Sequence, residues 1–85
     1  MEPFTANDRI SLGAVVKQKL ILYKLTGTWL IAQLADGGLD TDKFELSATL
    51  AGTRSGPKAD EILRRSLDIL NEYGVVWSGK DGSNG

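Results

Sequence analysis

The chain has 85 residues, a formal net charge of −1, and neither cysteine nor histidine. This length accommodates one domain, 1–85, and the missing residue types exclude disulfides, thiolate zinc sites and the usual catalytic base. The near-neutral balance argues mildly against nucleic-acid binding, so any basic surface must come from the local distribution of charge.

A first helix is predicted from about Asn7 to Lys24, and either Thr5 or Asn7 suits its N-cap. Residues 1–5 are expected to be flexible. The apolar residues fall on two stripes at helical spacing, where one stripe would suffice to dock the helix on a core. We therefore expect either a central core helix or a helix that also contacts a second copy, since small chains gain stability by association. The candidate dimer interface consists of Leu12, Val15, Val16, Leu20, Leu22 and Tyr23.

A break at Thr26–Thr28 separates this helix from a shorter one, predicted from Trp29 to Asp36. Gly27 suits the C′ position of the first helix, and Thr28 suits the N-cap of the second. The pair Gly37–Gly38 then ends the second helix.

The third predicted helix runs from about Asp42 to Ala51. Either Asp40 or Thr41 suits its N-cap. The negative charge of Asp42 in its first turn interacts favourably with the helix dipole. Gly52 ends this helix, and the polar turn TRSG follows.

The longest predicted helix begins at Pro57, where the missing N–H of proline costs nothing. Its apolar residues repeat at helical spacing up to Tyr73, and Gly74 suits its C′ stop. Val75–Trp77 are then expected in one arm of a small ribbon, and residues 78–85 are expected to be flexible.

The last two helices form a pair joined by a short polar turn containing glycine, which is the layout of a helix-turn-helix. In such proteins the N-terminal end of the second helix enters the major groove, where arginine reads guanine and hydroxyl groups contact phosphate. That end is locally basic here, although a solvated helix face would use the same residue types. The candidate DNA-binding residues are Thr53, Arg54, Ser55, Lys58, Glu61, Arg64 and Arg65.

Catalysis and ligand chemistry find little support in the chain. It contains neither a GxGxxG pattern nor a Walker-type loop with lysine. Asp40 and Asp42 lie close enough in sequence to suggest a cation site. The same spacing is found more often where one residue caps a helix and the other lies in its first turn. We expect no enzyme activity, no catalytic residues, no cofactor, no metal and no small-molecule ligand. No apolar run approaches about 20 residues and no signal-peptide pattern is present, so we expect a soluble, cytoplasmic protein without membrane partners.

Two segments resemble winged helix-turn-helix regulators. WLIAQLADGGLDTDKFELSATLAGT is similar to their opening, with the pattern Glu-Leu-small-x-x-Leu before glycine, and ILRRSLDILNEYGVV is similar to their recognition helix and exit. The chain departs from the pattern in an added Ala51 before the glycine, a longer turn, and few residues left for a wing. The matching positions are Glu45, Leu46, Ser47, Leu50, Gly52, Leu67, Leu70, Gly74 and Val75.

In length and layout the whole chain also resembles the KorC-type transcriptional repressors of conjugative plasmids. The resemblance rests on KLILYKLTGTWLIAQLADGG and TDKFELSATLAGTRSGPKADEIL. It implies a homodimer that binds palindromic operators in double-stranded DNA and represses plasmid genes. Base contacts would then come from the turn and the start of the recognition helix.

We therefore predict a mostly α, four-helix helix-turn-helix domain, winged-helix-like with a vestigial wing. The predicted function is sequence-specific DNA binding and transcriptional repression as a homodimer. Two alternatives stay open. One is a protein-interaction module such as an antitoxin or adaptor, which the near-zero charge favours slightly. The other is a recombination accessory factor that bends DNA.

Overall fold

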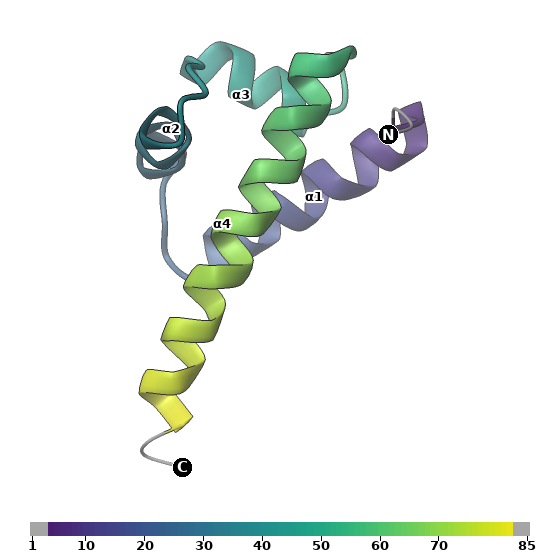
Figure 1. Cartoon of the computed structure of the whole chain (residues 1–85). Coiled ribbons are helices and arrows are strands. Elements are labelled where there is room, and N and C mark those ends of the chain that lie inside the picture. Colours follow the sequence, from purple (N-terminus) through teal and green to yellow (C-terminus); the bar gives the residue numbers. More distant parts are fainter. Residues whose placement is uncertain (1–3, 83–85) are drawn as a thin grey trace.

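The computed structural model describes the backbone of residues 4–82 and the side chains of residues 4–75. Within this part of the chain the helices are α1 (Ala6–Leu22), α2 (Gly27–Asp36), α3 (Lys43–Leu50) and α4 (Pro57–Gly82). Helices α1 and α2 each pack against both α3 and α4, and α3 also packs against α4 (Figure 1). The described residues include no strand, which confirms the prediction of a mostly α fold.

All four helices contribute to one apolar core, because each carries leucine, isoleucine or valine at helical spacing on the side facing its neighbours. Complete burial of such a side chain stabilises a fold by about 1.5–3 kcal/mol. The core residues are Val16, Leu20, Leu30, Leu34, Leu46, Leu50, Ile62, Leu63 and Leu70.

Helices α1 and α3 approach one another closely at Gly13, which is buried. A Cβ at this position would overlap the backbone carbonyl of Leu50 at the end of α3. Glycine is therefore required here by packing, and the contact fixes where α3 lies along α1.

Helix α1 begins as predicted and ends differently. The Thr5 hydroxyl accepts from the Asp8 N–H in a capping box, which confirms one of the two predicted caps. At the other end Lys24 adopts a positive φ of 59°, and the Leu25 N–H donates to the Leu20 carbonyl at 2.8 Å.

The predicted roles of Gly27 and Thr28 were therefore wrong, because Lys24 takes the left-handed position that ends α1. Gly27 is instead the first residue of α2. Thr26 is the N-cap of α2, and its hydroxyl accepts from the Trp29 N–H at 3.1 Å.

The N-cap of α3 is Asp42, whose carboxylate accepts from the Glu45 N–H at 2.7 Å. The prediction of Asp40 or Thr41 as the cap was wrong by one or two positions. Gly52 ends α3 as predicted, with a φ of 83°, and the Thr53 N–H closes the turn on the Ala48 carbonyl at 3.0 Å.

Helix α4 begins at Pro57 as predicted but does not stop at Gly74. Gly74 is buried inside the helix beneath Tyr23, and Val75–Trp77 continue the helix instead of forming a ribbon arm. The wing predicted for this segment is therefore replaced by helix, which extends through residues 78–82.

The flexibility predicted for residues 1–3 and 83–85 lies outside the described residues. No described helix is both long and apolar enough to span a membrane.

Candidate nucleic-acid interface

The turn between α3 and α4 presents polar side chains to solvent. Thr53, Arg54 and Ser55 are all exposed. The Thr53 hydroxyl donates to the Ala48 carbonyl at 3.0 Å, so this residue completes the end of α3. Gly56, with a φ of 104°, then redirects the backbone into α4. Among the described residues Arg54 has no ion-pair partner, so its guanidinium is available to a ligand.

Lys58, in the first turn of α4, is ion-paired to Glu45 of α3 at 3.0 Å. The Thr41 hydroxyl donates to the same carboxylate at 2.7 Å. The pKa of Glu45 is lowered, first by the hydrogen bond from Thr41 and then by that from Lys58. The pair joins α3 to α4, while about half of the Lys58 side chain stays exposed.

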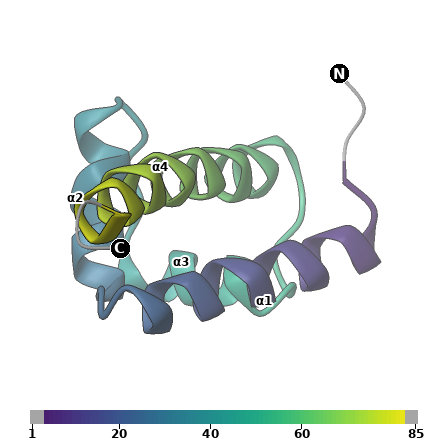
Figure 2. The same ribbon diagram turned by 90° about the horizontal axis from the view of Figure 1, so that it is seen from below.

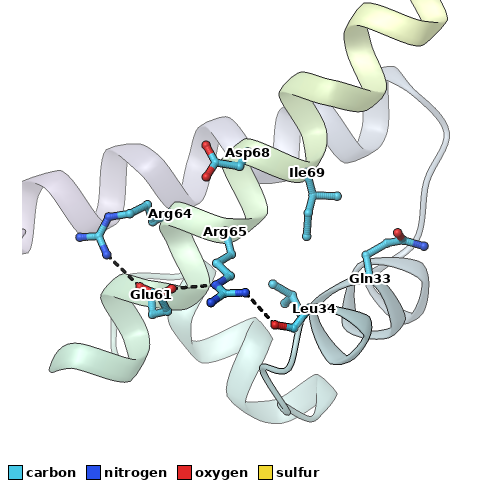
Figure 3. Close-up of a pocket in the computed structure, with 8 residues that line it drawn as sticks. Gln33, Leu34, Glu61, Arg64, Arg65, Asp68 and Ile69 are labelled. Atoms are coloured by element: carbon cyan, nitrogen blue, oxygen red, sulfur yellow. Dashed lines mark hydrogen bonds and ion pairs between the residues drawn. The ribbon is translucent and has the colours of Figure 1, made fainter.

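Glu61 holds both arginines of the next turn. Its carboxylate accepts from the Arg64 guanidinium at 3.0 Å and from Arg65 at 2.7 Å (Figure 3). Arg65 also donates to the Gly37 carbonyl at the end of α2, at 2.8 Å. The hydrogen bond from Arg65 is the main reason that the pKa of Glu61 is lowered. The two arginines are therefore partly neutralised and fixed in place by the protein itself.

The other side of α4 is joined to the N-terminal segment by a buried ion pair. Arg9 of α1 donates to Asp60 at 2.9 Å, and the Phe4 N–H donates to the same carboxylate at 3.3 Å. The hydrogen bond from Arg9 is the main reason that the pKa of Asp60 is lowered. The Arg64 guanidinium lies over the Phe4 ring, 5.2 Å from its centre. Sequence reasoning missed this group because no local pattern links positions about fifty residues apart.

A groove of about 290 Å³ lies between α2 and α4, beside the two arginines (Figure 3). Arg64 and Arg65 are balanced there by Glu61 and Asp68, so the charged side chains of the groove sum to zero. Among the described residues no group of three or more acidic side chains is placed to hold a metal ion. The lining residues are Gln33, Leu34, Gly37, Glu61, Arg64, Arg65, Asp68 and Ile69.

The candidate dimer residues, which lie in α1 and at its C-cap Tyr23, divide between two environments. Val16 and Leu20 are buried in the core, and Leu12 and Tyr23 pack against it. Val15 and Leu22 remain exposed, at 38% and 60%. Sequence reasoning missed Ile21, which is 77% exposed, although its spacing of three from Gln18 and seven from Ala14 places it on the same side of the helix as those exposed residues. Only part of the predicted set is thus available to a second copy.

The candidate DNA-binding residues therefore form two groups. Residues 53–58 lie together where α3 passes into α4, with Arg54 exposed and Lys58 half exposed. Glu61, Arg64 and Arg65 form a separate, internally paired network one turn further along α4. Comparison of the chain with protein-family models, with curated proteins and with solved structures finds no match.

Proposed function

We propose that this protein is a sequence-specific DNA-binding transcriptional repressor that acts as a homodimer on palindromic operators. The observation that carries the proposal is the exposed Arg54 in the turn before a long helix whose first turn holds the half-exposed Lys58. A helix-turn-helix reads DNA with this end of its second helix, inserted in the major groove. Helix α4 would be the recognition helix and α3 the supporting helix.

The ion pairs around this end of α4 indicate that its basic residues would contact DNA in different ways. Arg54 has no ion-pair partner among the described residues, so it is free to bind guanine bidentately. Lys58 exchanges one carboxylate partner for a phosphate at modest cost, because exposed ion pairs contribute little. Arg64 and Arg65 are held by Glu61 and are better suited to setting the orientation of α4 than to strong phosphate binding.

Repression would be steric, through occupation of a promoter by a dimer. Two copies related by a two-fold axis would place their α4 helices in successive major grooves, about 34 Å apart. The resemblance to KorC-type repressors adds the expectation that the operators lie on a conjugative plasmid.

Selection of bound duplexes from a random DNA pool tests the proposal directly. We expect a palindromic consensus. Binding to random duplex should weaken steeply with added salt, because phosphate contacts release counterions. Arg54→Ala should weaken operator binding by roughly 1–3 kcal/mol, as loss of a base contact does. Lys17→Ala removes a positive charge from an exposed position of α1. It is the matched control and should bind as the wild type does.

The outcomes for Arg54→Ala are distinguishable. An equal loss on operator and random DNA would make Arg54 a phosphate contact and leave the base-reading role to another residue. No loss on either DNA would remove Arg54 from the interface. Absence of salt-sensitive binding to any DNA would overturn the proposed function.

A second candidate function is a protein-interaction module, such as an antitoxin or adaptor. It is favoured by the balanced charge of the groove between α2 and α4 and by Phe44, which is 76% exposed on α3. This function predicts no affinity for DNA even at low salt, so the same binding experiment separates the two candidates.

A further inference from the structure

The outward side of α1 carries no charged residue along its whole length. The residues on this side recur at helical spacing, and every one of them is exposed. We call this surface the α1 outer face. It consists of Asn7, Ser11, Ala14, Val15, Gln18, Ile21 and Leu22.

The α1 outer face has the composition of a helix-pairing surface. Ile21 and Leu22 are 77% and 60% exposed at its C-terminal end, and Ser11 and Ala14 near the centre are small enough to allow a close approach. Figure 2 shows α1 along the lower edge of the molecule, with no other described element beneath it. Charged helix faces are the usual outcome at such a position, so an uncharged one indicates a partner.

We propose that α1 pairs in antiparallel fashion with α1 of a second copy, around a two-fold axis near Ala14. This arrangement places Ser11 opposite Gln18 of the second copy and Asn7 opposite its Leu22. The inference deepens the proposed function, because it rests on the homodimer proposed there and specifies how the two copies meet.

Charge on the flanks of the α1 outer face favours the antiparallel arrangement. Asp8 and Lys19 lie on the same flank, eleven positions or about three turns apart. Antiparallel pairing brings Asp8 of each copy near Lys19 of the other, which gives two symmetric ion pairs. Asp8 already accepts the Thr5 N–H through Oδ2, but a carboxylate has further acceptor sites. Parallel pairing would instead bring Lys17 of each copy near Lys19 of the other, which is repulsive, and would align the helix dipoles.

The size of the α1 outer face sets the expected strength of the pairing. A helix of 17 residues is about 25 Å long. A typical stable interface buries about 800 Å² of accessible surface on each partner, and one helix of this length buries less. We therefore expect a dimer that dissociates on dilution and that a two-fold DNA site reinforces.

Single-cysteine variants test the arrangement cleanly, because the natural chain contains no cysteine. Ala14→Cys should form a disulfide-linked dimer under mild oxidation, because it lies beside the proposed axis. Ser11→Cys and Gln18→Cys should each cross-link poorly alone, and a mixture of the two should cross-link efficiently. Ala32→Cys, on the exposed side of α2, is the control and should stay monomeric.

Two results would overturn the antiparallel proposal. Cross-linking of Ser11→Cys and Gln18→Cys each with itself, and not with each other, would indicate parallel helices. A protein that sediments as a monomer at millimolar concentration, with no cross-link at Ala14→Cys, would mean that the α1 outer face has another occupant.

A charged residue placed on the α1 outer face provides a second test of the dimer. Leu22→Lys should abolish the dimer in sedimentation while leaving the circular dichroism spectrum unchanged, because the side chain is exposed in the single copy. A folded Leu22→Lys variant that still dimerises would contradict the proposal.

Failure of the pairing and failure of the proposed function are distinguishable. A monomer that binds DNA in a salt-sensitive manner would overturn the pairing alone. A cross-linked dimer that binds no DNA would overturn the DNA-binding function alone.

Discussion

Gly74 lies directly beneath the phenol ring of Tyr23, so close that a methyl group at Gly74 would overlap the Tyr23 hydroxyl. Tyr23 follows α1 as its C-cap, and Gly74 lies inside α4, so this contact joins the C-terminal end of α1 to the second half of α4. The Tyr23 ring also packs against Tyr73, with 5.3 Å between ring centres. Glycine is present here for space, and it does not end the helix.

We predict that Gly74→Ala lowers the free energy of unfolding by about 1 kcal/mol, because the overlap outweighs the better helix propensity of alanine. In a Tyr23→Phe background the hydroxyl is gone and only the ring carbon, 3.2 Å from the added methyl group, stays close, so the same substitution should cost clearly less. Urea unfolding of the four proteins measures this coupling. Equal destabilisation in both backgrounds would mean that backbone conformation, and not the Tyr23 hydroxyl, requires glycine.

The sequence correctly predicted that Pro57 begins α4, but it wrongly predicted that Gly74 ends this helix. The start of α4, the cap at Thr5 and the apolar faces depend on neighbours within four residues and were predictable from spacing, whereas the caps of α2 and α3 were misplaced by one or two positions. Glycine has two uses, a left-handed backbone and a close approach, and sequence alone does not separate them. Gly52 serves the first use and Gly74 the second.

The candidate site shows the same limit. The exposed position of Arg54 follows from its place in a polar turn and was predictable. The pairing of Arg9 with Asp60, and that of Lys58 with Glu45, depends on how separate helices pack. A count of local charges therefore overstated the free positive charge on α4.

Gly13 should tolerate substitution less well than Gly74. A Cβ at Gly13 would overlap the backbone carbonyl of Leu50, which cannot rotate away as a side chain can. We predict that Gly13→Ala lowers the free energy of unfolding by about 3 kcal/mol, the upper end of the range for overpacking. Gly27→Ala is the matched control, because its Cβ would lie 3.8 Å from Leu46, an ordinary contact. A Gly13→Ala variant as stable as the control in urea would contradict the close α1–α3 approach.

The Arg9–Asp60 pair should make stability depend on pH in the acid range. Arg9 lowers the pKa of Asp60 below its ordinary value of 3.8 in the folded state. Because the folded pKa is below the unfolded one, the stabilisation is fully present above the unfolded pKa and is lost as pH falls through the folded pKa. Asp60→Asn should cost about 3 kcal/mol at neutral pH, since it leaves Arg9 buried without its anion.

Urea unfolding between pH 7 and pH 2.5 measures both effects. The variant should show a shallower loss of stability in acid than the wild type, with the curves converging at the lowest pH. Glu72→Gln, on the exposed side of α4, is the control and should follow the wild-type curve. Parallel curves for Asp60→Asn and the wild type would show that this pair does not cause the acid sensitivity.

Lys24 is the only non-glycine residue of the described chain with a positive φ, at 59°. Left-handed backbone costs an L-residue about 1–2 kcal/mol, and glycine relieves that cost but loses more entropy on folding. We predict that Lys24→Gly raises the free energy of unfolding by about 0.5–1 kcal/mol. Lys17→Gly, inside α1, should lower it by about 1 kcal/mol. Thermal unfolding compares the two, and a lower melting temperature for Lys24→Gly would contradict the assigned end of α1.

Glu61 should limit the affinity of the protein for DNA, if the proposed function is correct. Its carboxylate neutralises Arg64 and Arg65, which line the groove between α2 and α4. Glu61→Gln removes that charge, so both arginines become available to phosphates. We predict several-fold tighter binding to random duplex at low salt, and a dependence of log K on log salt that is steeper by roughly one unit.

Glu72→Gln is the matched control for this prediction, because it removes the same charge from α4 about three turns further along. Titration of labelled duplex at several salt concentrations measures both variants. The same gain in both would reflect net charge alone and would remove Glu61 from any specific role. A loss of binding in Glu61→Gln would instead make Glu61 itself a contact, since a carboxylate accepts from cytosine N4 in the major groove.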